Sequence, residues 1–139
     1  MLKRTLIIST VALVLVGTSV SIAQVKQGKT RPARTSHLMK GAIKPNCDAL
    51  KKAADVAPAD DRAWRSLAVN AGVVNEISYV LMDDGRCPDA KWADANKSMQ
   101  TGSAELLTAI AAKDHAAFKT AFGKTMQSCK ACHDAHKEK

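Results

Sequence analysis

Near its C-terminus the chain carries two cysteines and a histidine at a spacing that can attach haem. Residues 129–133 read Cys-Lys-Ala-Cys-His. Two residues separate the thiols, so both can add across the two vinyl groups of one haem, and the adjacent His133 can then give an imidazole nitrogen to the iron. On a helix Cys129, Cys132 and His133 share one face, because they are three and four positions apart. The motif predicts one covalent haem c.

Other uses of two close cysteines fit the sequence less well. A structural zinc site needs four ligands, usually as two close pairs, whereas Cys47 and Cys87 stand alone in the sequence. His136 could add one zinc ligand without completing a convincing set. A thioredoxin-like pair belongs to a βαβ unit, and no segment here shows the sustained alternation of a strand. Haem attachment is therefore the preferred interpretation.

The N-terminal residues 1–23 have the pattern of a secretory signal peptide. Lys3 and Arg4 precede an apolar stretch over 6–16, and small residues precede a cleavage point after Ala23. We predict a periplasmic protein that has no stable membrane insertion after cleavage. The alternative is an uncleaved membrane anchor, because the segment is close to the shortest helix that can span a bilayer.

The chain is basic, with a formal net charge of +8 that falls by two when Lys3 and Arg4 leave with the signal peptide. A basic exported protein can dock on an acidic redox partner by electrostatic attraction, although the charge can also serve solubility alone. The lysines are dispersed, and two Trp, one Tyr and two Phe are too few to form a base-stacking platform. We therefore expect no nucleic-acid binding.

Residues 24–36 are basic and polar, without apolar periodicity, and predict a flexible arm. A single domain over 37–139 follows. Its first helix should cover about 37–56, with a kink or break near Lys44 because Gly41 and Pro45 interrupt it.

Three further helices follow this first one in the pattern of apolar residues. The second should begin at Asp60 or Asp61 and end near Leu81, and the third should cover about 89–112. The last should begin at 114 and carry the Cys-Lys-Ala-Cys-His motif. Short connections between four helices predict an all-α, antiparallel four-helix bundle with haem c attached on the C-terminal helix.

The last helix resembles that of the class II cytochromes c, which include cytochrome c′ and its low-spin relatives. The resemblance rests on residues 116–123, Ala-Ala-Phe-Lys-Thr-Ala-Phe-Gly, with the haem motif five residues later and near the C-terminus. Residues 91–94 are similar to the start of the family's third helix, and 37–40 to the opening of its first. The chain departs from the family pattern at His136, where an aromatic residue is usual, and in having Cys47 and Cys87.

The resemblance implies that a residue near the start of the first helix faces the sixth position of the iron. That residue matches Met39, which shares a helical face with Ile43 and Leu50, whereas His37 lies on the polar side. Met39 is the preferred second ligand; ordinary packing of its thioether and ligation by His37 are the alternatives. His115 and His136 are predicted to be surface residues.

A methionine ligand implies a six-coordinate, low-spin one-electron carrier, which is the preferred function. The alternative is a five-coordinate cytochrome c′ that binds NO or CO. An enzyme is not expected, because a peroxidase would need a distal acid–base residue. The resemblance also leaves a homodimer through the first two helices open.

The two additional cysteines suggest a disulfide in an oxidising compartment. A bond between Cys47 and Cys87 would close a loop of about 40 residues and contribute about 3–4 kcal/mol. Free buried thiols are the alternative.

Overall fold

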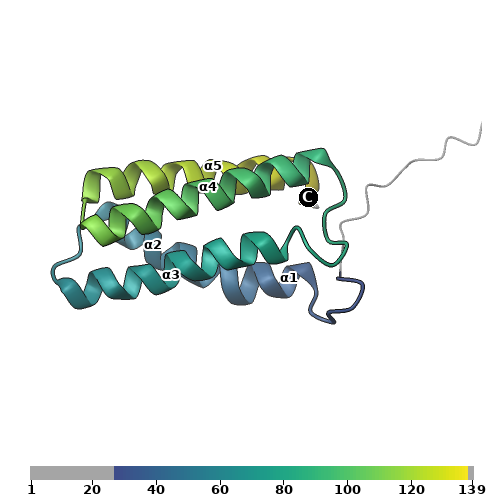
Figure 1. Cartoon of the computed structure of the whole chain (residues 1–139), viewed down its shortest axis with the longest axis horizontal. Helices are drawn as coiled ribbons and strands as arrows, with labels where there is room; N and C mark the ends of the chain where they lie inside the picture. The colour runs from purple at the N-terminus through teal and green to yellow at the C-terminus, as the bar shows by residue number, and fades with distance from the viewer. Residues whose placement is uncertain (1–26, 138–139) are drawn as a thin grey trace, which may run out of the picture.

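The computed structural model describes residues 27–137. The predicted signal peptide over 1–23 therefore lies outside the described residues. Within the described range the chain is helical and has no strand, apart from a single bridge between Gln27 and Arg34 (Figure 1). The prediction of an all-α four-helix bundle is confirmed. None of the described helices combines the length and the apolar character needed to cross a membrane.

The first long helix is made of three consecutive segments. These are α1 (Thr35–Leu38), the π-helical turn η1 (Met39–Ile43) and α2 (Lys44–Asp55). Pro45 occupies the first turn of α2. Its ring has no N–H to donate and would clash with the carbonyl four residues earlier in a regular α-helix, and a wider π turn accommodates this. The predicted interruption near Lys44 is thus a π-helical segment before the proline rather than a break.

The other three helices are α3 (Asp61–Val80), α4 (Ala90–Ala112) and α5 (His115–His136). Each follows an aspartate whose carboxylate accepts a hydrogen bond from a backbone N–H in the first turn. Such caps satisfy donors that the helix leaves without intrahelical partners.

The second, third and fourth helices were all predicted close to their observed starts. Asp60 caps α3, as one of the two predicted alternatives, with its Oδ1 2.7 Å from the backbone nitrogen of Ala63. Asp114 caps α5 as predicted. Between α4 and α5 the chain reverses direction over Lys113 and Asp114, and the φ of 53° at Lys113 is left-handed.

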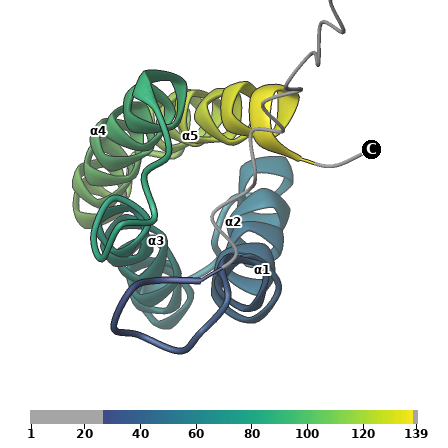
Figure 2. The same ribbon diagram turned by 90° about the vertical axis from the view of Figure 1, so that its right-hand side faces the viewer.

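Seen along the bundle, the helices form a ring in the order α5, α4, α3 and then α1 with α2 (Figure 2). α4 packs extensively against α5 and against α3, whereas α2 and α5 touch only sparingly. The ring is therefore closed least tightly between its first and last helices.

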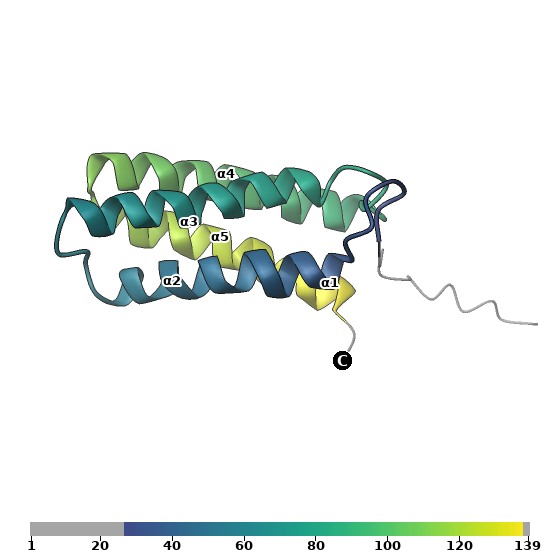
Figure 3. The ribbon, with the colours of Figure 1, turned by 90° about the horizontal axis from the view of Figure 1, so that it is seen from below.

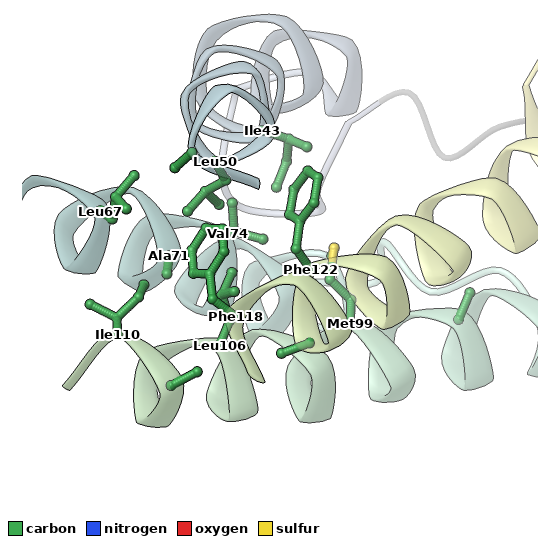
Figure 4. Close-up of a cluster of buried hydrophobic side chains, with 14 of the residues drawn as sticks. Ile43, Leu50, Leu67, Ala71, Val74, Met99, Leu106, Ile110, Phe118 and Phe122 are labelled. Atoms are coloured by element: carbon green, nitrogen blue, oxygen red, sulfur yellow. The ribbon is translucent and has the colours of Figure 1, made fainter. Parts of the chain in front are cut away.

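A cluster of fully buried apolar side chains lies toward the α4–α5 turn. Leu50, Val74, Leu106 and Phe118 are fully buried there (Figure 4). Trp64 packs edge-on against Phe118 with ring centroids 6.1 Å apart. The half of the bundle near the C-terminal end of α5 contributes fewer of these large apolar side chains, which leaves that half for the site.

Part of the predicted flexible arm is fastened to the α3–α4 connection. The Asp84 carboxylate accepts hydrogen bonds from the backbone nitrogens of Thr30 at 2.8 Å and Arg31 at 2.9 Å. The guanidinium of Arg86, only 1% exposed, donates to the carbonyl of Ala33 at 2.8 Å. The flexible-arm prediction for 24–36 thus needs correction where the structure describes that segment. These contacts could not be predicted from the local sequence, because the two partners of each contact lie more than 50 residues apart.

Candidate haem-binding site

A cavity of about 660 Å³ opens between the first helix and the C-terminal half of α5. In the view from below this end of α5 and α1 overlap (Figure 3), whereas the view along the bundle separates them (Figure 2). The inner lining combines apolar side chains with the cysteines and histidine of the motif: Met39, Ile43, Cys47, Trp92, Cys129, Cys132, His133 and His136. The size falls within the range of pockets that bury small ligands and cofactors.

The motif residues all reach this cavity from one face of α5. Cys132 is buried, Cys129 is half-buried, and His133 lies at an exposed position on the rim. The helical spacing of three and four residues brings them together, as the sequence predicts. α5 therefore presents two thiols and an imidazole to one shared space.

The two motif thiols differ in acidity. A hydrogen bond from Cys47 lowers the pKa of Cys129 to about 7, and Ser128 contributes in the same direction. Burial raises the pKa of Cys132 to about 11. Because the thiolate is the reactive form of cysteine, Cys129 is the stronger nucleophile of the pair at neutral pH.

His133 is suited to bind a metal through a neutral ring nitrogen. Partial desolvation of the ring at the cavity rim lowers the pKa of His133, and the neighbouring Lys137 acts in the same direction. A lowered pKa keeps the imidazole neutral at neutral pH, and the neutral ring is the form that ligates iron.

Met39 and Ile43 reach the same cavity from the first helix. The predicted shared face of these two residues is thus present, and the π turn does not remove it. His37 is exposed and is not among the lining residues. The structure therefore brings Met39, and not His37, into the same cavity as His133.

These residues fit a haem c. Two thiols and an imidazole come from α5, the apolar Met39 and Ile43 come from the first helix, and the volume is sufficient for a flat aromatic macrocycle. Cys129 and Cys132 could hold the vinyl carbons, and His133 could hold the iron. The lysines at the mouth, Lys40, Lys44, Lys130 and Lys137, could face the haem propionates.

His136 and His115 are less exposed than predicted. His136 is 7% exposed, packs edge-on against Trp92 with ring centroids 5.4 Å apart, and has its Nε2 3.3 Å from the Asp89 carboxylate. His136 follows Cys132 by four positions, so the two residues share a helical face. This spacing could have predicted that His136 points inward. His115 is half-buried, with Nε2 2.8 Å from the carbonyl of Ala53.

The predicted bond between Cys47 and Cys87 is not formed, and all four cysteines are free. The Cys47 side chain lines the same cavity as Cys129, and the interaction with Cys129 raises the pKa of the Cys47 thiol. Cys87 lies in the α3–α4 connection, where its thiol donates to the carbonyl of Asp89 at 3.5 Å. The sequence distance between the cysteines gave no information on which helix face each would occupy, and this led to the wrong pairing.

Known proteins resemble the chain in both sequence pattern and fold. The pattern of the cytochrome C′ family matches residues 88–137, which include α4, α5 and the haem motif. No curated protein matches the chain. One solved structure that resembles it is the nitric oxide complex of a leucine-to-alanine mutant of cytochrome c prime from Alcaligenes xylosoxidans, with 23% sequence identity and a TM-score of 0.53. The similarity covers 75% of this chain and 93% of that one.

The family pattern lies over the helix that carries the thiols and the imidazole, and the fold agrees over most of the chain. Over α4 and α5 the chain therefore matches the cytochrome C′ family, and its four-helix fold resembles that of a cytochrome c prime, a combination that fits one covalent haem c.

Proposed function

We propose that the chain attaches its haem through Cys129 and Cys132, uses His133 as an iron ligand, and binds a small gas such as NO or CO at the opposite face of the iron. The observation that carries this proposal is the pairing, in one cavity, of the motif face of α5 with the apolar Met39 and Ile43. The structurally similar cytochrome c prime is a nitric oxide complex, and this supports the same chemistry here.

Each residue has a defined task. The iron of the bound haem supplies the site where a diatomic gas coordinates. Cys129 and Cys132 would hold the macrocycle, and the imidazole of His133 would supply a nitrogen ligand for the metal. Met39 and Ile43 exclude water from the gas-binding face, which favours small apolar ligands over polar ones.

A one-electron carrier with Met39 as the second iron ligand is the other candidate. It is favoured by one observation, namely that Met39 and His133 line the same cavity from opposing helices. A thioether opposite a histidine raises the reduction potential of haem iron. Neither candidate requires a catalytic side chain, and we keep the prediction that the chain is not an enzyme.

Absorption spectra of the holoprotein and of Met39→Leu, each with and without CO, separate the two candidates. Leucine keeps the size and apolar character of methionine but cannot ligate iron. We expect a high-spin ferric spectrum for both proteins, and a shift of the ferrous Soret band with CO in both. A low-spin wild type that ignores CO, with CO binding gained in Met39→Leu, would instead establish Met39 as a ligand and the carrier function.

The location and partner remain proposals that fit this function. The signal-peptide pattern supports export to the periplasm, where haem c is attached. Lys40, Lys44, Lys130 and Lys137 surround the cavity mouth, although Lys44 and Lys130 also pair with neighbouring aspartates. A positive rim beside the haem suits an acidic redox partner through electrostatic steering. We propose no nucleic-acid partner.

A further inference from the structure

We propose that the side-chain carbonyl of Asn96 binds one water molecule in a small pocket beside the haem cavity, and that an incoming gas must displace this water. The water site itself depends only on the residues that form the pocket. Its effect on gas binding rests on the proposed gas-binding function.

Asn96 is a buried amide whose oxygen has no donor. The side chain lies on α4 and is only 2% exposed. Its Nδ2 donates a hydrogen bond to the carbonyl of Trp92 at 2.9 Å. Because a carbonyl only accepts, this bond identifies the nitrogen end of the amide. The Oδ1 end is left, and none of the described residues donates to it. A buried acceptor without a donor destabilises a fold, so this oxygen calls for a ligand that donates.

A second, much smaller cavity is lined by Asn96. Its volume is about 30 Å³, which is about the space that one molecule occupies in liquid water. The hydroxyl of Ser128 and the imidazole of His133 also line this pocket. Together with Asn96 they supply polar partners for the two to four hydrogen bonds that a buried water makes. The pocket shares five lining residues with the haem cavity: Met39, Ile43, Cys129, Cys132 and His133.

The position of Asn96 on α4 shows from which side it approaches this pocket. Asn96 and Ser103 are seven positions apart and share a helical face. Ser103 faces α3, because its Oγ accepts a hydrogen bond from the Nδ2 of Asn75 at 2.9 Å. Gly102, one position earlier, faces α5 and approaches Thr125 closely. Asn96 therefore lies toward α3 rather than toward α5, the helix that carries the haem motif.

Met39 also approaches from the α3 side, because η1 packs against α3. Asn96 thus belongs with Met39 and Ile43 to the proposed gas-binding face. These two apolar side chains keep bulk water out, and the amide oxygen of Asn96 can hold a single molecule among them. An apolar gas that displaces a well-ordered water does not replace the hydrogen bonds of that water. Asn96 is therefore expected to slow gas binding.

A crystal structure of the oxidised holoprotein tests the water site directly. We expect an ordered water within hydrogen-bond distance of Asn96 Oδ1, and no water at this place in Asn96→Leu, because leucine is similar in size but has no acceptor. A protein or haem group bonded to Oδ1, or a dry pocket, would overturn the proposal. The wild-type structure alone decides this even where the variant fails to fold.

The association rate of CO with the reduced holoprotein, measured by flash photolysis, tests the consequence. Asn96→Leu should bind CO about fivefold faster than wild type, the factor that the loss of one ordinary hydrogen bond gives. Asn46→Leu is the matched control and should keep the wild-type rate. Asn46 makes the same kind of bond, from its Nδ2 to the carbonyl of Ala42 four positions earlier at 2.6 Å, but it is not among the lining residues of either cavity.

The two proposals fail in different ways. Equal CO association rates in wild type and Asn96→Leu would overturn the role of Asn96 and leave the gas-binding function intact. A wild type that does not bind CO would contradict the gas-binding function and the effect on gas entry, while the crystal structure would still decide the water site.

Discussion

At the scale of single residues, Trp92 joins three parts of the molecule near the site. Its Nε1 donates a hydrogen bond to the carbonyl of Leu81 at 2.7 Å, and both groups are buried. Its ring also packs against His136 and lines the haem cavity. Trp92 therefore links the end of α3 and the start of α4 to the last turn of α5.

Replacing Trp92 by phenylalanine should lower the free energy of unfolding. The change leaves the Leu81 carbonyl buried without this donor, and an unsatisfied buried polar group costs about 1–3 kcal/mol. Denaturant unfolding of the holoprotein measures the loss. Tyr79→Phe is the control, because Tyr79 is 53% exposed and should change stability little. Equal stability of Trp92→Phe and wild type would contradict the role of this bond.

Residue-scale predictions from the sequence succeeded where the information was local. Cys129, Cys132 and His133 were placed on one face because their spacing alone determines it. Cys47 and His136 were misjudged because their environments depend on partners from other helices. Met39 was predicted only in part. The helical period indicates that it points inward, but it does not determine the distance between its sulfur and the haem iron, and that distance decides whether Met39 is a ligand.

At the scale of elements, α4 and α5 approach closely at Gly102. A Cβ at this position would lie 3.0 Å from the backbone nitrogen of Thr125 and 2.9 Å from its Oγ1. Backbone cannot move aside as a flexible side chain can, so the absence of a side chain at Gly102 permits the packing distance of the two helices. This contact lies beside Ser128 and Cys129, and it therefore helps to position the motif.

Gly102→Ala should destabilise the holoprotein by about 1–3 kcal/mol, the usual cost of overpacking a tight contact. Gly123→Ala is the matched control within α5, because nothing lies within 4 Å of its added Cβ. The control should gain roughly 0.5–1 kcal/mol from the better helix propensity of alanine. Thermal or denaturant unfolding compares the two, and a Gly102→Ala protein as stable as Gly123→Ala would refute the close-contact account.

The arm and the α3–α4 connection form a second element-scale contact, through Asp84. Backbone hydrogen bonds from Arg31 and Thr30 lower the pKa of Asp84 below its usual value of 3.8. The folded state thus prefers the carboxylate, so Asp84 contributes stability that is present above pH 3.8 and is lost as the pH falls through its lower, folded-state pKa.

Asp84→Asn should therefore be less stable than wild type at pH 6, and the difference should shrink as the pH falls below about 3.8, where the wild-type carboxyl also becomes neutral. Unfolding free energies across this pH range give the test. A difference that stays constant with pH would mean that the charge of Asp84 does not fasten the arm.

The sequence predicted helix starts better than it predicted helix interiors. Asp60 and Asp114 are visible as caps because capping depends on residues three positions apart. The π turn over Met39–Ile43 was not foreseen, since Pro45 indicates a disturbance without specifying its form. The hydrogen bonds that Asp84 and Arg86 form with the arm were not predicted, because they join residues far apart in the sequence.

At the scale of the whole molecule, the ring of helices divides into two halves. The half near the α4–α5 turn is filled by side chains such as Phe118 and Leu106. The other half, between the first helix and the end of α5, holds the cavity. With only five aromatic residues in the chain, a covalent haem is the large apolar body that completes this second half.

The central claim is that haem is covalently attached at Cys129 and Cys132. The most direct test is the intact mass of the purified holoprotein under denaturing conditions, compared with that of the double variant Cys129→Ala, Cys132→Ala. We predict that the wild type retains the mass of one haem after denaturation and that the double variant has none. Release of haem from the denatured wild type, or its retention by the double variant, would contradict the account.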